Sequence, residues 1–126
     1  MKRMIVIAAL FAALLAGCGG GTAHLYSLQK TTACLKKQPV RLGGPLDFVA
    51  STATGGAVKI HLADNFLTLV FGSTVDDASN IADAYRRFAA KNVGVNDVLH
   101  QDQNSVTLWH LHWTQADLNM IGGCLK

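Results

Sequence analysis

The most regular alternation of apolar and polar residues lies between residues 57 and 72. Apolar side chains occupy every second position on either side of a short polar stretch: Val58, Ile60, Leu62, Leu67, Leu69 and Phe71. A period of two predicts strands that bury one face. Asp64 and Asn65 separate the two runs and predict a two-residue turn that pairs Leu62 with Leu67. The pattern therefore indicates a β-hairpin whose two strands bury the same face.

Three other segments have the spacing of amphipathic helices. Residues 27–37, 75–91 and 115–124 place apolar residues three and four positions apart. Thr74 and Thr114 precede the second and third segments, where a threonine hydroxyl can cap the first turn. In the second segment the predicted apolar stripe comprises Ala78, Ile81, Ala82, Tyr85, Phe88 and Ala89.

The remaining segments predict further strands and turns. Residues 97–101 and 106–113 predict a second hairpin around the polar stretch 102–105. The weaker segment 46–54 lies between two glycine pairs and predicts an edge strand. From residue 57 the order is ββαββα, with an additional N-terminal helix. We therefore expect an α+β domain of two layers, with about four antiparallel strands and helices mainly on one face.

The first 17 residues have a different character. Lys2 and Arg3 precede an uncharged apolar run over residues 4–16, which is the order of a secretory signal. A helix over this run reaches about 20 Å, less than the roughly 30 Å of a bilayer core. The segment is therefore predicted to direct export and not to remain as a membrane-spanning helix.

The apolar run ends in Leu15-Ala16-Gly17-Cys18. This motif resembles the lipobox of bacterial lipoproteins, in which the signal is removed and the cysteine receives a diacylglyceryl group. The resemblance implies a signal peptide over residues 1–17, lipidation of Cys18 with acyl chains such as palmitate, a short glycine tether over 18–23 and a single domain over 24–126. It also implies an anchor on the extracytoplasmic side of the cell membrane or outer membrane. The alternative is an ordinary cleavage site with an incidental Cys18.

The chain has three cysteines. Lipidation of Cys18 leaves Cys34 and Cys124 as an even pair in a compartment where disulfides form. A bridge between them would close a loop of about 90 residues and stabilise the fold by about 4 to 5 kcal/mol on the chain-entropy model. The alternative is two buried free thiols.

Charge limits the choice of partners. Without the predicted signal, the chain carries nine basic and eight acidic side chains, which argues against nucleic acid. Four basic residues follow the tether closely: Lys30, Lys36, Lys37 and Arg41. They are expected either to attract anionic lipid headgroups, by about 1 kcal/mol each, or to form a solvated helix face.

The sequence Trp109-His110-Leu111-His112-Trp113 is the strongest candidate for metal chemistry. On a strand His110 and His112 would share a face about 7 Å apart, near enough to converge on copper or zinc. His61 or His100 would then supply a third imidazole. The alternative is ordinary histidines on a sheet surface. For the two tryptophans, a core layer is favoured over an exposed platform for a partner.

Catalytic motifs are not found in the sequence. Ser73, Ser79 and Ser105 could join a histidine and an aspartate, but there is no nucleophile elbow, zinc-protease helix, phosphate loop or dinucleotide fingerprint. All eight acidic residues are aspartates, and Asp76 and Asp77 are explained by the start of a helix.

We therefore predict a membrane-anchored, non-enzymatic interaction or structural module without a cofactor, with an envelope protein as its candidate partner. Metal binding and a small hydrolase are the alternatives. Residues 55–88 resemble small uncharacterised bacterial envelope proteins, a likeness that implies no activity.

Overall fold

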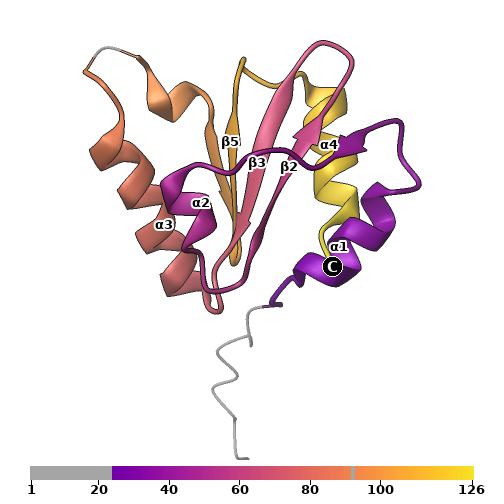
Figure 1. The fold of residues 1–126 in the computed structure, drawn as a ribbon, viewed down its shortest axis with the longest axis horizontal. Coiled ribbons are helices and arrows are strands. Elements are labelled where there is room, and N and C mark those ends of the chain that lie inside the picture. Colours follow the sequence, from indigo (N-terminus) through magenta and orange to yellow (C-terminus); the bar gives the residue numbers. More distant parts are fainter. Residues whose placement is uncertain (1–23, 92) are drawn as a thin grey trace, which may run out of the picture.

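The computed structural model describes residues 24–91 and 93–126, which form a five-stranded sheet with helices on both faces (Figure 1). The elements in chain order are α1 (Leu28–Leu35), β1 (Arg41–Leu42), α2 (Phe48–Ser51), β2 (Ala57–His61), β3 (Phe66–Phe71), α3 (Val75–Phe88), the 3-10 helix η1 (Val95–Asp97), β4 (Leu99–Asp102), β5 (Ser105–Trp109) and α4 (Gln115–Cys124). Every strand pairs antiparallel with its neighbours, in the order β1-β2-β3-β5-β4. The predicted signal peptide, the predicted tether and Cys18 lie outside the described residues.

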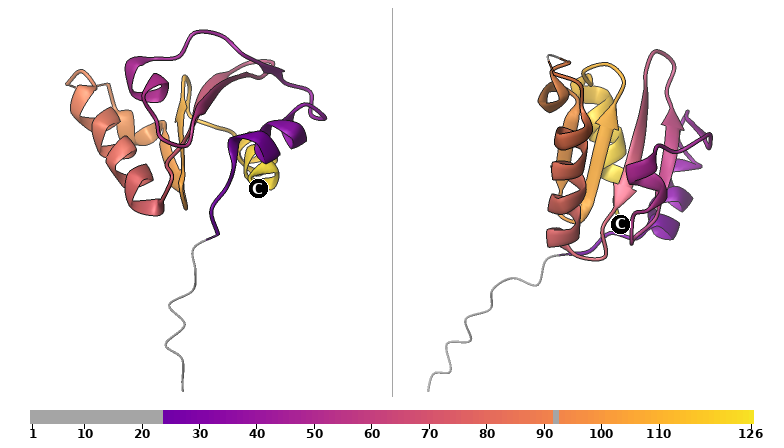
Figure 2. Two further views of the ribbon diagram at one scale, coloured as in Figure 1. Left: turned by 60° about the horizontal axis from the view of Figure 1, so that its bottom comes forward. Right: turned by 60° about the vertical axis from the view of Figure 1, so that its left-hand side comes forward.

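The α+β class is confirmed, but the helices are divided between the two faces of the sheet. One apolar cluster joins α1 and α4 to the sheet, and a second joins α2 and α3 to its opposite side (Figures 1 and 2). The prediction of two layers with helices mainly on one face was therefore wrong. The reason lies in the central strand, where all five residues of 67–71 are buried, so that both faces need a cover. The strand count is five because β1 extends the sheet beside β2.

The first hairpin is present with the predicted inward face. Ile60, Leu67 and Leu69 are fully buried in the same cluster. The predicted register was wrong by two positions, because Ile60 pairs with Leu67 and the turn lies at residues 63–64. Asn65 explains the difference: its side-chain amide donates to the carbonyl of Leu111 and accepts from the N–H of the same residue, both at 2.9 Å. A residue bonded in this way to a neighbouring segment is not available for the tip of the turn.

The second hairpin turns at Gln103 and Asn104. Gln103 adopts a left-handed conformation with φ of 52°. The Asn104 side chain is 2% exposed, accepts from the N–H of Tyr26 and donates to the carbonyls of Tyr26 and Gly72. These bonds fix the chain that leads into α1 against the end of β3. The final strand stops at Trp109, four residues before the predicted end.

Segment 46–54 forms a helix instead of the predicted edge strand. Asp47 caps the short helix α2 by accepting a hydrogen bond from the N–H of Ala50 at 2.9 Å. An aspartate at this position satisfies a backbone N–H of the first helical turn that would otherwise lack a partner. The edge strand beside β2 is formed by Arg41 and Leu42.

The other helices begin where their capping residues predict. Thr74 and Thr114 accept hydrogen bonds from the N–H groups three residues later, at the starts of α3 and α4. The second predicted helix ends at Phe88, not at residue 91, because Ala89 has an extended backbone with ψ of 138°. None of the helices in the described ranges combines the length and hydropathy that a bilayer crossing requires.

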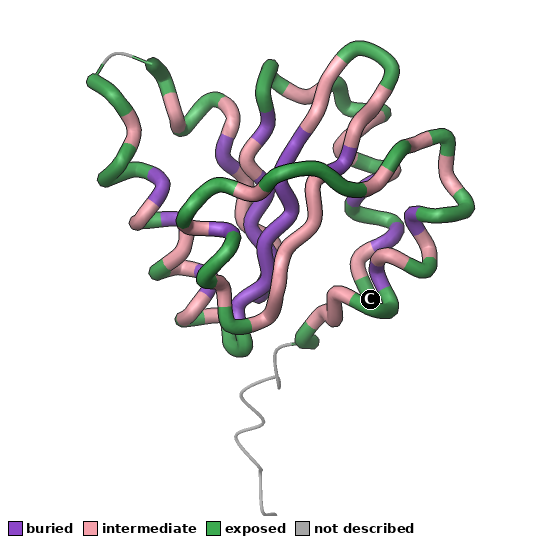
Figure 3. The backbone as a smooth tube through the Cα atoms, viewed as in Figure 1, coloured by how far each residue is buried: buried purple, intermediate pink, exposed green. Residues whose placement is uncertain are grey.

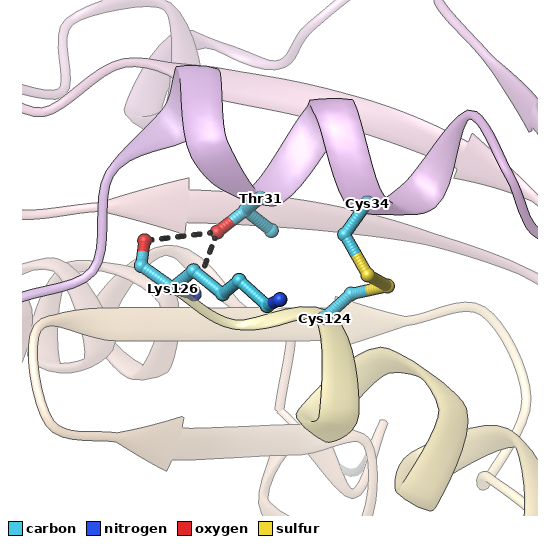
Figure 4. The surroundings of a disulfide bond; sticks show 4 residues. All are labelled: Thr31, Cys34, Cys124 and Lys126. Carbon is cyan, nitrogen blue, oxygen red and sulfur yellow. Dashed lines mark hydrogen bonds between the residues drawn. A yellow bond between two sulfur atoms is a disulfide. The ribbon is translucent and has the colours of Figure 1, made fainter.

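The face covered by α1 and α4 is held by a covalent link and by hydrogen bonds. Cys34 and Cys124 form the predicted disulfide, with Cα atoms 5.3 Å apart (Figure 4). The buried hydroxyl of Thr31 accepts from the N–H of Lys126 at 3.1 Å, beside the disulfide.

Buried residues are concentrated on the central strands (Figure 3). Since residues 24–126 contain both apolar clusters and the disulfide, this part of the chain holds the interactions that define its fold.

Candidate binding groove

A cavity of about 690 Å³ opens on the face of the sheet that α2 and α3 cover. We call it the groove. Its floor is formed by strands β2, β3 and β5, and its walls by α2, the end of α3 and the segment around η1. The lining residues are Pro45, Asp47, Phe48, Val49, Lys59, Phe66, Thr68, Tyr85, Phe88, Ala89, Val93, Val95, Val98, Leu108, Trp109 and His110.

The length of α2 explains why the groove is open. Helix α2 contacts β2 and β3, but its four residues span only about 6 Å. The six residues of β3 extend over about 20 Å. On this side of β3, Val70 and Thr68 are buried, whereas Phe66 at the start of the strand is only partly covered.

Three large apolar side chains at the groove are exposed to solvent. Phe48 is 75% exposed, Phe88 is 69% exposed and Val93 is 61% exposed. Phe88 belongs to the apolar stripe that the sequence predicts for α3, but it does not reach the core. A cluster of exposed apolar side chains beside a cavity is typical of a binding surface.

Tyr85 and Asp47 form a polar link between the two helices of this face. The Tyr85 hydroxyl donates to the Asp47 carboxylate, at 2.9 Å from one oxygen and 3.1 Å from the other. Burial, followed by the charge and hydrogen bond of Asp47, raises the pKa of Tyr85 well above its usual range. Tyr85 therefore remains a neutral donor that ties α3 to the start of α2.

At the other side of the floor, a cation lies over an aromatic ring. The Lys59 ammonium is 4.8 Å from the centre of the Phe66 ring. The imidazole of His110 stacks on the same ring, with centroids 4.4 Å apart and planes 12° apart. In the described ranges the ion pair is Asp83 with Arg86, and Lys59 forms no salt bridge. This end of the groove therefore presents positive charge without a carboxylate partner.

The histidines predicted as metal ligands each have other contacts. Because β5 ends at Trp109, His110 and His112 do not share a strand face. His110 stacks on Phe66, whereas His112 stacks on Trp113 with centroids 4.4 Å apart. His61 has its Nε2 atom 3.0 Å from the Gly43 carbonyl oxygen. Within residues 24–91 and 93–126, no three histidine, cysteine, aspartate or glutamate side chains are grouped as metal ligands.

The serines proposed for a hydrolase have other hydrogen-bond partners. Ser73 donates to Asp77, Ser79 to the Val75 carbonyl and Ser105 to the Asp102 carbonyl.

Trp109 is 2% exposed and its indole N–H donates to Thr107, which agrees with the favoured core position. Trp113 packs at the edge of the same cluster.

Sequence patterns did not indicate the groove. In the sequence, Lys59 occupies an outward position of a strand, Phe48 belongs to the expected edge strand, and Phe88 belongs to the apolar stripe predicted for a helix. The one available signal was Asp47 three residues before Ala50, which fits a helix cap. The chain matches no protein-family model, no curated protein and no solved structure. Its function is therefore inferred from the groove and from the sequence.

Proposed function

We propose that this protein is a lipid-anchored component of the bacterial envelope that binds an apolar ligand in the groove. The groove itself carries the proposal, because its volume of about 690 Å³ lies within the range of about 300 to 1,000 Å³ that small-molecule sites occupy. Such sites are mainly apolar with a few polar groups. The lining has this composition, with Lys59, Thr68 and the Tyr85–Asp47 pair among apolar side chains.

The exposed rim supplies the driving force for binding. Phe48, Phe88 and Val93 keep more than half of their surface in water. Covering apolar surface is favourable by about 25 cal/mol for each Å² removed from water. A ligand that fills the groove and contacts these side chains therefore gains affinity without a rearrangement of the core.

The anchoring part of the proposal is supported by the sequence before the domain. The lipobox ends at Cys18, and residues 24–46 contain four basic side chains but no acidic one. Lys30, Lys36, Lys37 and Arg41 are all exposed. A basic surface close to the anchor favours an anionic membrane, by about 1 kcal/mol for each residue at the lipid surface.

The groove is tested with the neutral fluorescent probe N-phenyl-1-naphthylamine and the oxidised chain from residue 19. Ala89 lines the groove, whereas Ala90 is exposed and does not. The variant Ala89→Trp is expected to fill the groove and weaken probe binding at least tenfold, while the matched variant Ala90→Trp binds like the wild type. Circular dichroism checks that both are folded. Absence of probe binding to the wild type, or equal binding by both variants, would refute the groove as a ligand site.

The anchor is tested separately in cells. Radiolabelled palmitate is expected to enter the wild-type chain and not the Cys18→Ala variant. Labelling of both chains, or of neither, would contradict lipidation at Cys18.

A further inference from the structure

We infer that the ligand of the groove is an amphiphile with a single alkyl chain and an anionic head group, and that the head group lies beside Lys59. This inference rests on the proposed function and adds the chemical class of the ligand. It depends on where charge and apolar surface are placed within the groove.

The first step concerns Lys59, which projects from β2 onto the groove floor. Its ammonium lies over the Phe66 ring at 4.8 Å and has no carboxylate partner among the described residues. A ligand that covers this region removes water from the charge. A cationic ligand leaves that loss uncompensated and a neutral oxygen compensates it only in part, whereas an anion replaces the water with a stronger, charge-assisted contact.

The second step concerns Asp47, the acidic group that also lines the groove. Its carboxylate accepts hydrogen bonds from the Tyr85 hydroxyl and from the N–H of Ala50. Both oxygens therefore already have partners within the protein. A cationic head group would therefore gain less at Asp47 than an anionic head group gains at Lys59. The groove accordingly favours anionic ligands.

The third step distinguishes an alkyl chain from a peptide. Away from Lys59 the lining is mainly apolar and includes Phe88, Val95, Val98 and Leu108, while the Tyr85 hydroxyl and the Asp47 carboxylate are already paired with each other. A peptide in this region would bury amide groups without partners, which is costly. An alkyl chain has no such groups, and each methylene that it buries adds to affinity.

The test compares decanoate, decanol and decyltrimethylammonium, which share one alkyl chain and differ in head-group charge. Each displaces N-phenyl-1-naphthylamine from the oxidised chain that begins at residue 19. Decanoate is expected to displace the probe at a concentration about fivefold lower than decanol, with decyltrimethylammonium the weakest.

Three variants assign the preference to one side chain. Lys59→Met removes the charge and keeps an apolar stem, and is expected to bring decanoate to the level of decanol. Lys59→Arg is expected to keep the preference. Lys30→Met, which removes an exposed charge on α1, is expected to behave as the wild type.

The outcomes separate the inference from the proposed function. Equal displacement by the three amphiphiles overturns the anionic head group and leaves the groove as an apolar site. A decanoate preference that survives in Lys59→Met overturns the placement of the head group beside Lys59. Failure of the probe to bind the wild type refutes the proposed function itself.

Discussion

The two faces of the central sheet are covered in different ways. On the first, which we call the closed face, α1 and α4 are joined by the Cys34–Cys124 disulfide and pack on large side chains such as Phe71 and Trp109. On the second, the groove face, α2 and α3 bury mainly small residues, among them Ala50 and Ala78. The closed face is held by a covalent bond and large buried side chains, whereas the groove face buries smaller side chains and is linked by the hydrogen bonds of Tyr85 to Asp47.

This difference separates stability from binding. A face that buries large side chains supplies most of the hydrophobic free energy, which is proportional to the apolar area removed from water. A four-residue helix such as α2 cannot cover six-residue β3 and leaves the groove open. We therefore expect changes on the closed face to affect mainly unfolding, and changes on the groove face to affect mainly ligand binding.

The largest expected effect is that of removing the disulfide. The double variant Cys34→Ala, Cys124→Ala is expected to lose about 4 to 5 kcal/mol of unfolding free energy on the chain-entropy model, because the bridge closes a long loop. Urea unfolding followed by circular dichroism measures this loss. Molecules that remain folded should bind the fluorescent probe with unchanged affinity, and a parallel loss of binding would show that the two faces are not independent.

A second comparison uses the same substitution on each face. Leu69 is fully buried on the closed face, whereas Leu108 is partly exposed on the groove face. Leu69→Ala is expected to cost about 2 to 5 kcal/mol of unfolding free energy, and Leu108→Ala clearly less because its side chain already contacts solvent. Probe titration should show the reverse order, with binding weakened by Leu108→Ala. Equal costs in stability would contradict the distinction between the faces.

Within the groove face, Tyr85 connects α3 to α2. Tyr85→Phe is expected to cost about 1 to 3 kcal/mol, since the hydrogen bond is made to a charged carboxylate. The pKa of Tyr85 is raised in the folded state above its unfolded value of about 10. The associated stability is present below about pH 10 and decreases as the pH rises further.

Thermal unfolding between about pH 9 and pH 11 measures this dependence, which should be weaker in Tyr85→Phe than in the wild type. A residual dependence is expected from Tyr26, whose pKa is also raised by burial and by Asp102. Identical pH profiles for the two proteins would refute the role of Tyr85.

The smallest expected effect lies at the start of α3. The Ser73 hydroxyl and then Thr54 donate to Asp77 and hold the pKa of its carboxyl below the usual value. The resulting stability is present above the unfolded pKa of about 3.9 and is lost as the pH falls through the lower folded value. Melting temperatures at pH 7 and at about pH 2 should therefore differ less in Asp77→Asn than in the wild type, with probe binding at pH 7 unchanged. An equal decrease in both proteins would contradict this assignment.

Local patterns in the sequence determined the elements that depend on neighbouring residues. The alternation over residues 57–72 predicted the first hairpin and its buried face, and the caps at Thr74 and Thr114 predicted where α3 and α4 begin. The cysteine count predicted the disulfide. The hairpin and the helix starts are encoded by spacing and residue type within one segment. The disulfide follows from the even number of cysteines that remain when Cys18 is lipidated.

Only the tertiary structure decided the features that depend on contacts between distant segments. The register of the first hairpin follows from the bonds of Asn65 to Leu111. Because β5 ends at Trp109, His110 and His112 lie beyond the strand on which they were predicted to share a face. The groove likewise combines Lys59, Phe48 and Phe88 from three elements. A sequence pattern reports which side of an element is apolar, but not whether a neighbouring element is long enough to cover it.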